Sequence, residues 1–222
     1  MKKIVFAFLL CSCTFLNAQD LTNAANLKKY AAANTAYTKQ VVFIGNSITE
    51  GWPKTNPAFF SDNNFIGRGI SGQTSPQLLL RFRQDVINLH PVAVVINVGT
   101  NDIAQNSGEY IPEFTMSCIQ SMAELAEYNG IKVILSSVLP GGEFPWRKEV
   151  KDVPQKIDAL NVMIKAYATS KGYPYIDYNT SMRDEKGAMK AELARDGIHP
   201  TKEGYQIMEQ KALEIIGREI RF

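Results

Sequence analysis

The stretch VVFIGNSITEGW, residues 41–52, begins with four consecutive apolar residues and continues into glycine and polar residues. A short apolar run rich in β-branched and aromatic side chains is typical of a strand that is buried on both faces. Gly45 then permits a tight turn, while Asn46 and Ser47 are residue types that often begin helices. We therefore interpret the stretch as strand, turn and helix, the unit that builds a parallel α/β sheet.

The same alternation continues along the rest of the chain. The predicted strands lie at 41–44, 65–66, 92–98, 132–138 and 175–178. The predicted helices lie at about 73–89, 111–128, 155–171 and 202–218. Alternating strands and helices require crossover connections, which produce a parallel sheet with helices on both faces. The predicted fold class is therefore α/β, a three-layer α/β/α sandwich around a five-stranded parallel sheet.

The first residues of the chain have the features of a secretory signal. Lys2 and Lys3 precede an apolar stretch that runs to about Leu16, and Ala18 offers a cleavage site. The stretch is shorter than the ~20 residues that are needed to span a bilayer. We expect cleavage after Ala18 and a secreted or periplasmic protein, with lipid attachment at Cys13 as the alternative.

Length and composition limit the class of protein and the number of domains that the chain can form. The chain has 222 residues, of which 45% are hydrophobic and 21% charged, and this suits one globular domain. We predict a signal peptide at 1–18, a helical extension at 19–39 and the main domain at 40–222. Without Lys2 and Lys3 the basic residues number 24 − 2 = 22, against 22 acidic residues. This balance argues against a nucleic-acid partner, and we expect no stable membrane partner unless Cys13 is lipidated.

Cysteine and histidine are scarce. Cys118 alone would survive cleavage, and it lies in an apolar-periodic stretch where a buried, inert thiol is expected. The chain has two histidines, too few for a typical zinc site. We expect neither a metal nor a cofactor.

In a parallel sheet, ligands bind at the carboxyl ends of the strands. Ser47 follows the first predicted strand, where its amide and the start of the next helix favour a developing negative charge. Gly69 and Gly72 follow the second strand and permit close approach of the backbone to a ligand. Asn101 follows the third strand and offers a side-chain amide donor. Each feature alone is also compatible with ordinary turn and helix-capping chemistry.

The segment RDGIHPTKEGY, residues 195–205, places an acid and a histidine three residues apart before the last predicted helix. Pro200 disfavours helical geometry at His199, so the imidazole is held in the loop. The carboxylate of Asp196 can orient Nδ1–H of the ring, which leaves Nε2 to accept a proton from a serine.

Taken together, these four segments resemble the blocks of the SGNH (GDSL-type) hydrolase family, in the same order. The resemblance runs from about residue 41 to the last helix and implies that family's flavodoxin-like fold. It implies Ser47 as nucleophile, Asp196 as orienting acid and His199 as base. It also implies an oxyanion hole formed by the amides of Ser47 and Gly69 and by the side chain of Asn101.

The first block departs from the family pattern at two positions. Asn46 stands where the family usually has aspartate, and Ile48 where it has leucine. Neither residue transfers a proton, and the amide oxygen of Asn46 can still accept a hydrogen bond. We expect the turn to keep its shape, with a changed local charge.

The resemblance implies hydrolysis of a small-molecule or glycan carboxylic ester through an acyl-enzyme intermediate. The chain shows no long apolar insertion that could serve as a lid. In its longest candidate active-site loop, 139–154, Trp146 and Arg147 are candidates for an aromatic wall and a cation in the substrate cleft. We expect short acyl groups, such as acetyl groups on glycans. A lipid or lysophospholipid acyl hydrolase is the alternative, and a catalytically degenerate glycan-binding module is the alternative from another class.

Overall fold

The computed structural model describes residues 21–34 and 40–220. The predicted signal peptide at 1–18, with Cys13, lies outside the described residues. Within them, no helix is long and apolar enough to cross a membrane.

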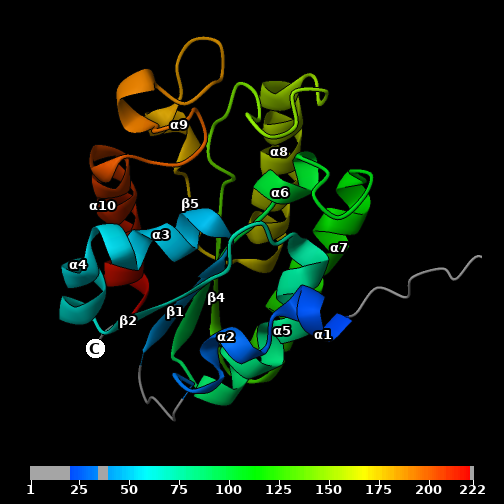
Figure 1. The fold of residues 1–222 in the computed structure, drawn as a ribbon. Coiled ribbons are helices and arrows are strands. Elements are labelled where there is room, and N and C mark those ends of the chain that lie inside the picture. Colours follow the sequence, from blue (N-terminus) through cyan, green and yellow to red (C-terminus); the bar gives the residue numbers. More distant parts are fainter. Residues whose placement is uncertain (1–20, 35–39, 221–222) are drawn as a thin grey trace, which may run out of the picture.

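The molecule is built on a five-stranded sheet in which every neighbouring pair of strands is parallel (Figure 1). The strand order is β2-β1-β3-β4-β5. The strands are β1 Val41–Gly45, β2 Phe65–Gly69, β3 Ala93–Asn97, β4 Lys132–Ser136 and β5 Tyr175–Ile176. The sequence places all five strands correctly, although their ends differ by a few residues.

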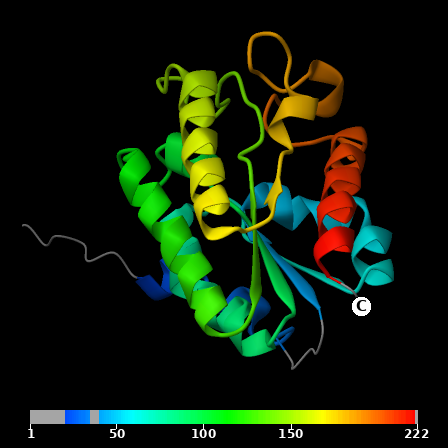
Figure 2. The same cartoon turned by 180° about the vertical axis from the view of Figure 1, so that it is seen from behind.

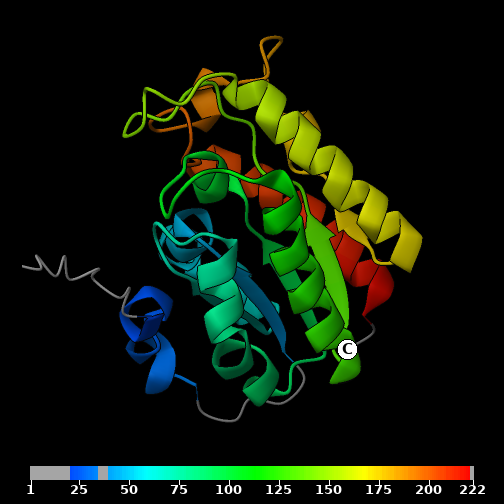
Figure 3. The same cartoon turned by 90° about the vertical axis from the view of Figure 1, so that its right-hand side faces the viewer.

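Helices cover both faces of this sheet. They are α1 Leu21–Ala25, α2 Lys28–Ala31, α3 Ser47–Thr55, α4 Pro57–Asp62, α5 Ser75–Asp85, α6 Thr100–Ile103, α7 Pro112–Tyr128, α8 Val153–Lys171, α9 Asn179–Met182 and α10 Lys202–Glu219. Short 3₁₀ turns occupy Ile87–Leu89 and Ala191–Leu193. The α/β/α sandwich predicted from the sequence is confirmed (Figures 2 and 3).

Two apolar clusters hold the layers together, because successive side chains of a strand point to opposite faces. Val42 and Ile44 of β1 belong to the cluster beneath α5, α7 and α8. Val41 and Phe43 belong to the cluster beneath α3, α4 and α10. Figure 2 shows α7 and α8 on one side of the sheet and α4 and α10 on the other. Both faces of β1 are thus buried, as its uninterrupted apolar run predicts.

The N-terminal segment 21–34 forms two short helices rather than one. Asn26, between α1 and α2, has a positive φ of 50° and turns the chain. Ala25 is buried, and α1 packs against α5. Figure 3 shows both helices, in blue, at one edge of the molecule.

Candidate active site

Three side chains from the two ends of the domain meet at the carboxyl edge of the sheet. The Oγ atom of Ser47 lies 2.9 Å from Nε2 of His199. Nδ1 of the same ring lies 2.7 Å from Oδ2 of Asp196. The structure therefore brings together the serine, histidine and acid that the sequence singled out.

The serine is positioned by the turn that joins β1 to α3. A Cβ on Gly45 would lie 2.1 Å from Oγ1 of Thr49 and 2.7 Å from the carbonyl oxygen of Asn97, so a larger residue does not fit. The side-chain oxygen of Asn46 accepts a hydrogen bond from the amide of Ile48 at 3.0 Å and caps α3. The amide oxygen thus performs the capping expected of it.

The histidine is held by a closed loop ahead of α10. The amides of Ile198 and His199 donate to Oδ1 of Asp196, at 3.1 and 2.8 Å. The amide of Arg195 donates to the carbonyl of His199 at 2.8 Å. Partial burial of Asp196 favours a raised pKa, but these donors and the His199 ring outweigh it and lower the pKa below its usual value. The carboxylate is therefore ionised at neutral pH.

Amide donors line the same cleft as the Ser47 hydroxyl. Nδ2 of Asn101 donates to the carbonyl of Gln73 at 2.9 Å, which leaves its second hydrogen without a partner among the described residues. The backbone amides of Ser47 and Gly72 likewise have no hydrogen-bond partner within the described part of the chain. Three donors are thus available at this edge of the sheet for a negatively charged oxygen.

The cleft around Ser47 has two adjoining parts. One, of about 420 Å³, is lined by Ser47, Ser71, Gly72, Asn101, Asn106, Trp146 and His199. The other, of about 430 Å³, is lined by Ser47, Glu50, Gly51, Lys54, Ser71, Arg195, Asp196 and His199. Trp146 is the one large apolar side chain among these residues, and the other lining residues are small, polar or charged.

The model of the GDSL-like lipase/acylhydrolase family matches residues 43–207, which span β1 to α10. The chain belongs to this family. This is a family of hydrolases of the acylhydrolase and esterase type, and the SGNH fold predicted from the four blocks of the sequence is confirmed.

Other proteins are similar to this GDSL-type hydrolase. The crystal structure of a GDSL-like lipase from Bacteroides thetaiotaomicron is 53% identical, with a TM-score of 0.87, and the match covers 89% of this chain and all of that one. An acetylxylan esterase of Xylanibacter ruminicola is 24% identical, and the match covers 91% of this chain but 47% of that protein. This hydrolase thus spans about half the length of that relative. An acetylxylan esterase of Geobacillus stearothermophilus is 26% identical over 69% of this chain and 72% of its own.

One predicted oxyanion donor is not in the cleft of this hydrolase. Gly69 ends β2, and a Cβ there would lie 2.1 Å from the amide nitrogen of Glu50 in α3. Its carbonyl accepts a hydrogen bond from Tyr30. N–H and C=O of one strand residue point to the same side, so the Gly69 amide faces the outer edge of the sheet. The assignment to Gly69 is wrong, and Gly72, three residues later, lines the cleft in its place.

The two candidate substrate-binding residues in the loop 139–154 lie in different surroundings. Trp146 lines the cleft, with its ring centroid 6.0 Å from that of His199. Arg147 points elsewhere, because Nε and Nη2 donate to the carbonyls of Ala104 and Gln105 at the end of α6. The prediction that Arg147 supplies a cation to the cleft is therefore wrong.

The cations that do line the cleft are Lys54 and Arg195. Lys54 is paired with Glu50 at 2.9 Å. The guanidinium of Arg195 has no ion-pair partner among the described residues. Arg195 lies next to Asp196 in sequence, so the motif itself could have drawn attention to it.

Asn106 is a site residue that the sequence analysis missed. Its Nδ2 donates to Oδ1 of Asn101 at 3.0 Å, and its Oδ1 accepts from Nε1 of Trp146 at 3.0 Å. Asn106 therefore sets which way the Asn101 amide points and ties it to the aromatic wall. It belongs to no block of the family pattern, and no sequence signal marked it.

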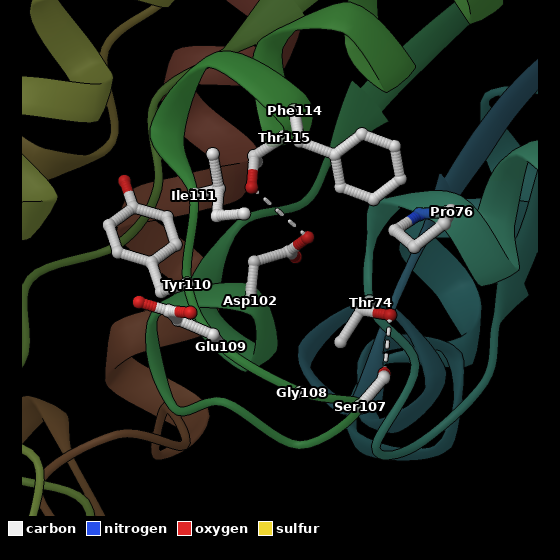
Figure 4. A pocket seen from close by; sticks show the side chains of 10 residues that line it. All are labelled: Thr74, Pro76, Asp102, Ser107, Gly108, Glu109, Tyr110, Ile111, Phe114 and Thr115. Carbon is white, nitrogen blue, oxygen red and sulfur yellow. Dashed lines mark hydrogen bonds between the residues drawn. The ribbon is translucent and has the colours of Figure 1, made fainter.

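Asp102, next to Asn101, turns away from the cleft into a cavity of about 60 Å³ (Figure 4). Its carboxylate accepts hydrogen bonds from the amide and hydroxyl of Ser75, at 3.0 and 2.6 Å, and thereby holds the start of α5. Burial raises the pKa of this carboxyl, and the Ser75 donors oppose the rise. Of these two neighbouring residues, Asn101 therefore lines the cleft, whereas Asp102 stabilises the start of α5.

Among the described residues, no group of three or more His, Cys, Asp or Glu side chains is placed to hold a metal ion. Cys118 is buried on α7.

Proposed function

We propose that this hydrolase removes short acyl groups, acetyl above all, from glycans, with Ser47 as nucleophile. The observation that carries the proposal is the pair of contacts that joins Ser47 Oγ to Nε2 of His199 and Nδ1 of His199 to Asp196, at 2.9 and 2.7 Å. This is the arrangement in which an imidazole deprotonates a serine while a carboxylate stabilises the imidazolium.

The reaction proceeds in two halves. As Ser47 Oγ attacks the ester carbonyl, its proton passes to Nε2 of His199, and the amides of Ser47 and Gly72 with the side chain of Asn101 receive the oxyanion. The imidazolium then gives the proton to the departing alcohol, and an acyl-serine remains. A water molecule, deprotonated at Nε2, attacks the acyl-serine, and Ser47 regains its proton as the acid leaves.

The lining of the cleft supports a short acyl group. Longer acyl chains gain about 0.8 kcal/mol per methylene only where apolar surface receives them. In this part of the cleft Trp146 provides one aromatic wall, and the other lining side chains, among them Ser71, Asn101 and Asn106, are too short and polar to form an extended apolar channel. The two acetylxylan esterases among the relatives support an acetylated glycan, and export by the predicted signal at 1–18 would bring the protein to extracellular glycans.

A panel of aryl esters from acetate to dodecanoate, used below micelle-forming concentrations, tests the proposal. We expect kcat/KM to be highest for acetate and to fall at least about tenfold by octanoate, because added methylenes find no burial. The Ser47→Ala variant is the control for turnover at other sites. Efficiency that rises through octanoate would instead support the lipid acyl hydrolase, and absence of turnover on every ester would support the binding module.

A further inference from the structure

The N-terminal segment 21–34 lies outside the residues that the family model matches. It nevertheless contacts the turn Gly69–Gln73, which carries two residues of the cleft, Ser71 and Gly72. The contacts reach this turn at three points.

The first contact is to Gln73. Its Nε2 donates to the carbonyls of Ala24 and Ala25 in α1, at 3.0 and 3.1 Å. Its Oε1 accepts from Nε of the buried Arg81 at 2.6 Å, and its main-chain carbonyl accepts from Asn101. Gln73 therefore joins the N-terminal segment directly to an oxyanion donor.

The second contact reaches Ser71 through α3. Nζ of Lys29 lies 2.7 Å from Oε1 of Glu50, and Oε2 of Glu50 accepts from the amide and the hydroxyl of Ser71, each at 2.7 Å. Partial burial favours a raised pKa for Glu50, but the hydrogen bonds from Lys29, Ser71 and Lys54 lower it to about 2. The carboxylate is therefore charged throughout the working pH range of an esterase.

The third contact is to Gly69, whose carbonyl accepts the Tyr30 hydroxyl at 2.5 Å. The guanidinium of Arg68 lies over the Tyr30 ring, 4.8 Å from its centroid. Burial raises the pKa of Tyr30 to about 12, so its hydroxyl remains a donor.

Gly72 itself has no packing that fixes it. It is exposed, its φ is +79°, and a Cβ built there would meet no atom within 4 Å. Its carbonyl accepts one long hydrogen bond, from Nδ2 of Asn106 at 3.4 Å. The direction of its amide otherwise depends on its neighbours Ser71 and Gln73, and both are held by the contacts above.

We propose that the segment Leu21–Asn34 positions the turn Gly69–Gln73, with Lys29 and Tyr30 as positioning residues that keep the Gly72 amide directed at the cleft. The inference rests on the proposed function, because that amide acts only when an oxyanion forms. A donor displaced from its place stabilises the transition state less while ground-state binding changes little. A purely structural segment would instead change the melting temperature and leave kcat alone.

Four variants of the full-length protein, assayed on an aryl acetate, test this role. We expect Lys29→Met and Tyr30→Phe to lower kcat by about 5- to 50-fold, less than the 10²- to 10³-fold for loss of a whole donor, with KM within about twofold. Lys29→Arg should restore most of the rate, because it restores the charge at Glu50. Lys28→Met is the matched control: Lys28 is exposed on the same helix and makes no ion pair with a described residue, so it should behave as wild type.

A double-mutant cycle of Lys29→Met with Glu50→Gln adds a second readout. If Lys29 acts through Glu50, the combined loss should be smaller than the product of the separate losses. The inference is wrong if both Lys29→Met and Tyr30→Phe keep kcat within twofold of the control, or if both unfold at the assay temperature. Failure of the proposed function gives a different result: no ester turnover by the wild type, or turnover that survives Ser47→Ala.

Discussion

The site residues that the sequence predicts best are those that belong to short local motifs. Asp196 and His199 are three residues apart in one loop, and Ser47 comes two residues after the strand that ends at Gly45, so local spacing places each of them. Gly69 and Gly72 could not be told apart in this way. Packing of Gly69 against α3 decides which of them faces the cleft, and that contact joins residues distant in sequence.

Asn101→Ala should lower kcat by about 10²- to 10³-fold, because one oxyanion donor is lost. KM should change much less, since the free hydrogen of Nδ2 acts mainly in the transition state. Steady-state kinetics on an aryl acetate measure both constants. Asn106→Ala, which frees the Asn101 amide without removing it, should lose less. A loss confined to KM would show that Asn101 binds the ground-state substrate instead.

At the scale of elements, short helices were the least predictable. Asn46 and Ser47 indicate the start of a helix, but the extent of α3 leaves no pattern in the sequence, because Gly51 and Pro53 lie within it and both disfavour helix interiors. Buried packing compensates: the Trp52 indole stacks on Phe59 at 5.1 Å between ring centroids, and Nε1 donates to Glu209. Tertiary contacts of this kind outweigh local propensity and leave no periodic signal.

Glu50 joins α2, α3 and the turn Gly69–Gln73, and its ionisation makes the stability of this region depend on pH. Its pKa falls from 4.5 to about 2 in the folded state. The resulting stabilisation of the folded state is complete above the pKa that Glu50 has in the unfolded chain. It is lost as pH falls from about 4.5 to about 2. The melting temperature of wild type should therefore fall more over this range than that of Glu50→Gln.

Thermal unfolding followed by circular dichroism from pH 7 to pH 2.5 provides the comparison. Glu185→Gln is the control, since Glu185 is exposed and has no ion-pair partner among the described residues. Asp196, whose pKa is also lowered, contributes the same slope to every variant. Parallel curves for wild type and Glu50→Gln would show that the ionised Glu50 does not stabilise the folded state.

For the whole molecule, the alternation of apolar runs and helical patterns was sufficient to predict the sandwich. The carboxyl ends of parallel strands converge on one edge, which explains why residues from β1, β3 and the loop before α10 meet there. The contacts of the N-terminal segment were not predictable in the same way. They join side chains and main-chain carbonyls of 21–34 to residues about 20 to 50 positions later, and contacts at such separations follow no periodicity.

We propose Ser47 as the nucleophile of a serine ester hydrolase. Treatment of the purified protein with a fluorophosphonate, followed by peptide mapping with mass spectrometry, tests this proposal most directly. We predict one adduct, on the hydroxyl of Ser47, with esterase activity lost in proportion to labelling and no adduct on Ser47→Ala. An adduct on another serine of the cleft, such as Ser71, together with turnover retained by Ser47→Ala, would contradict the account.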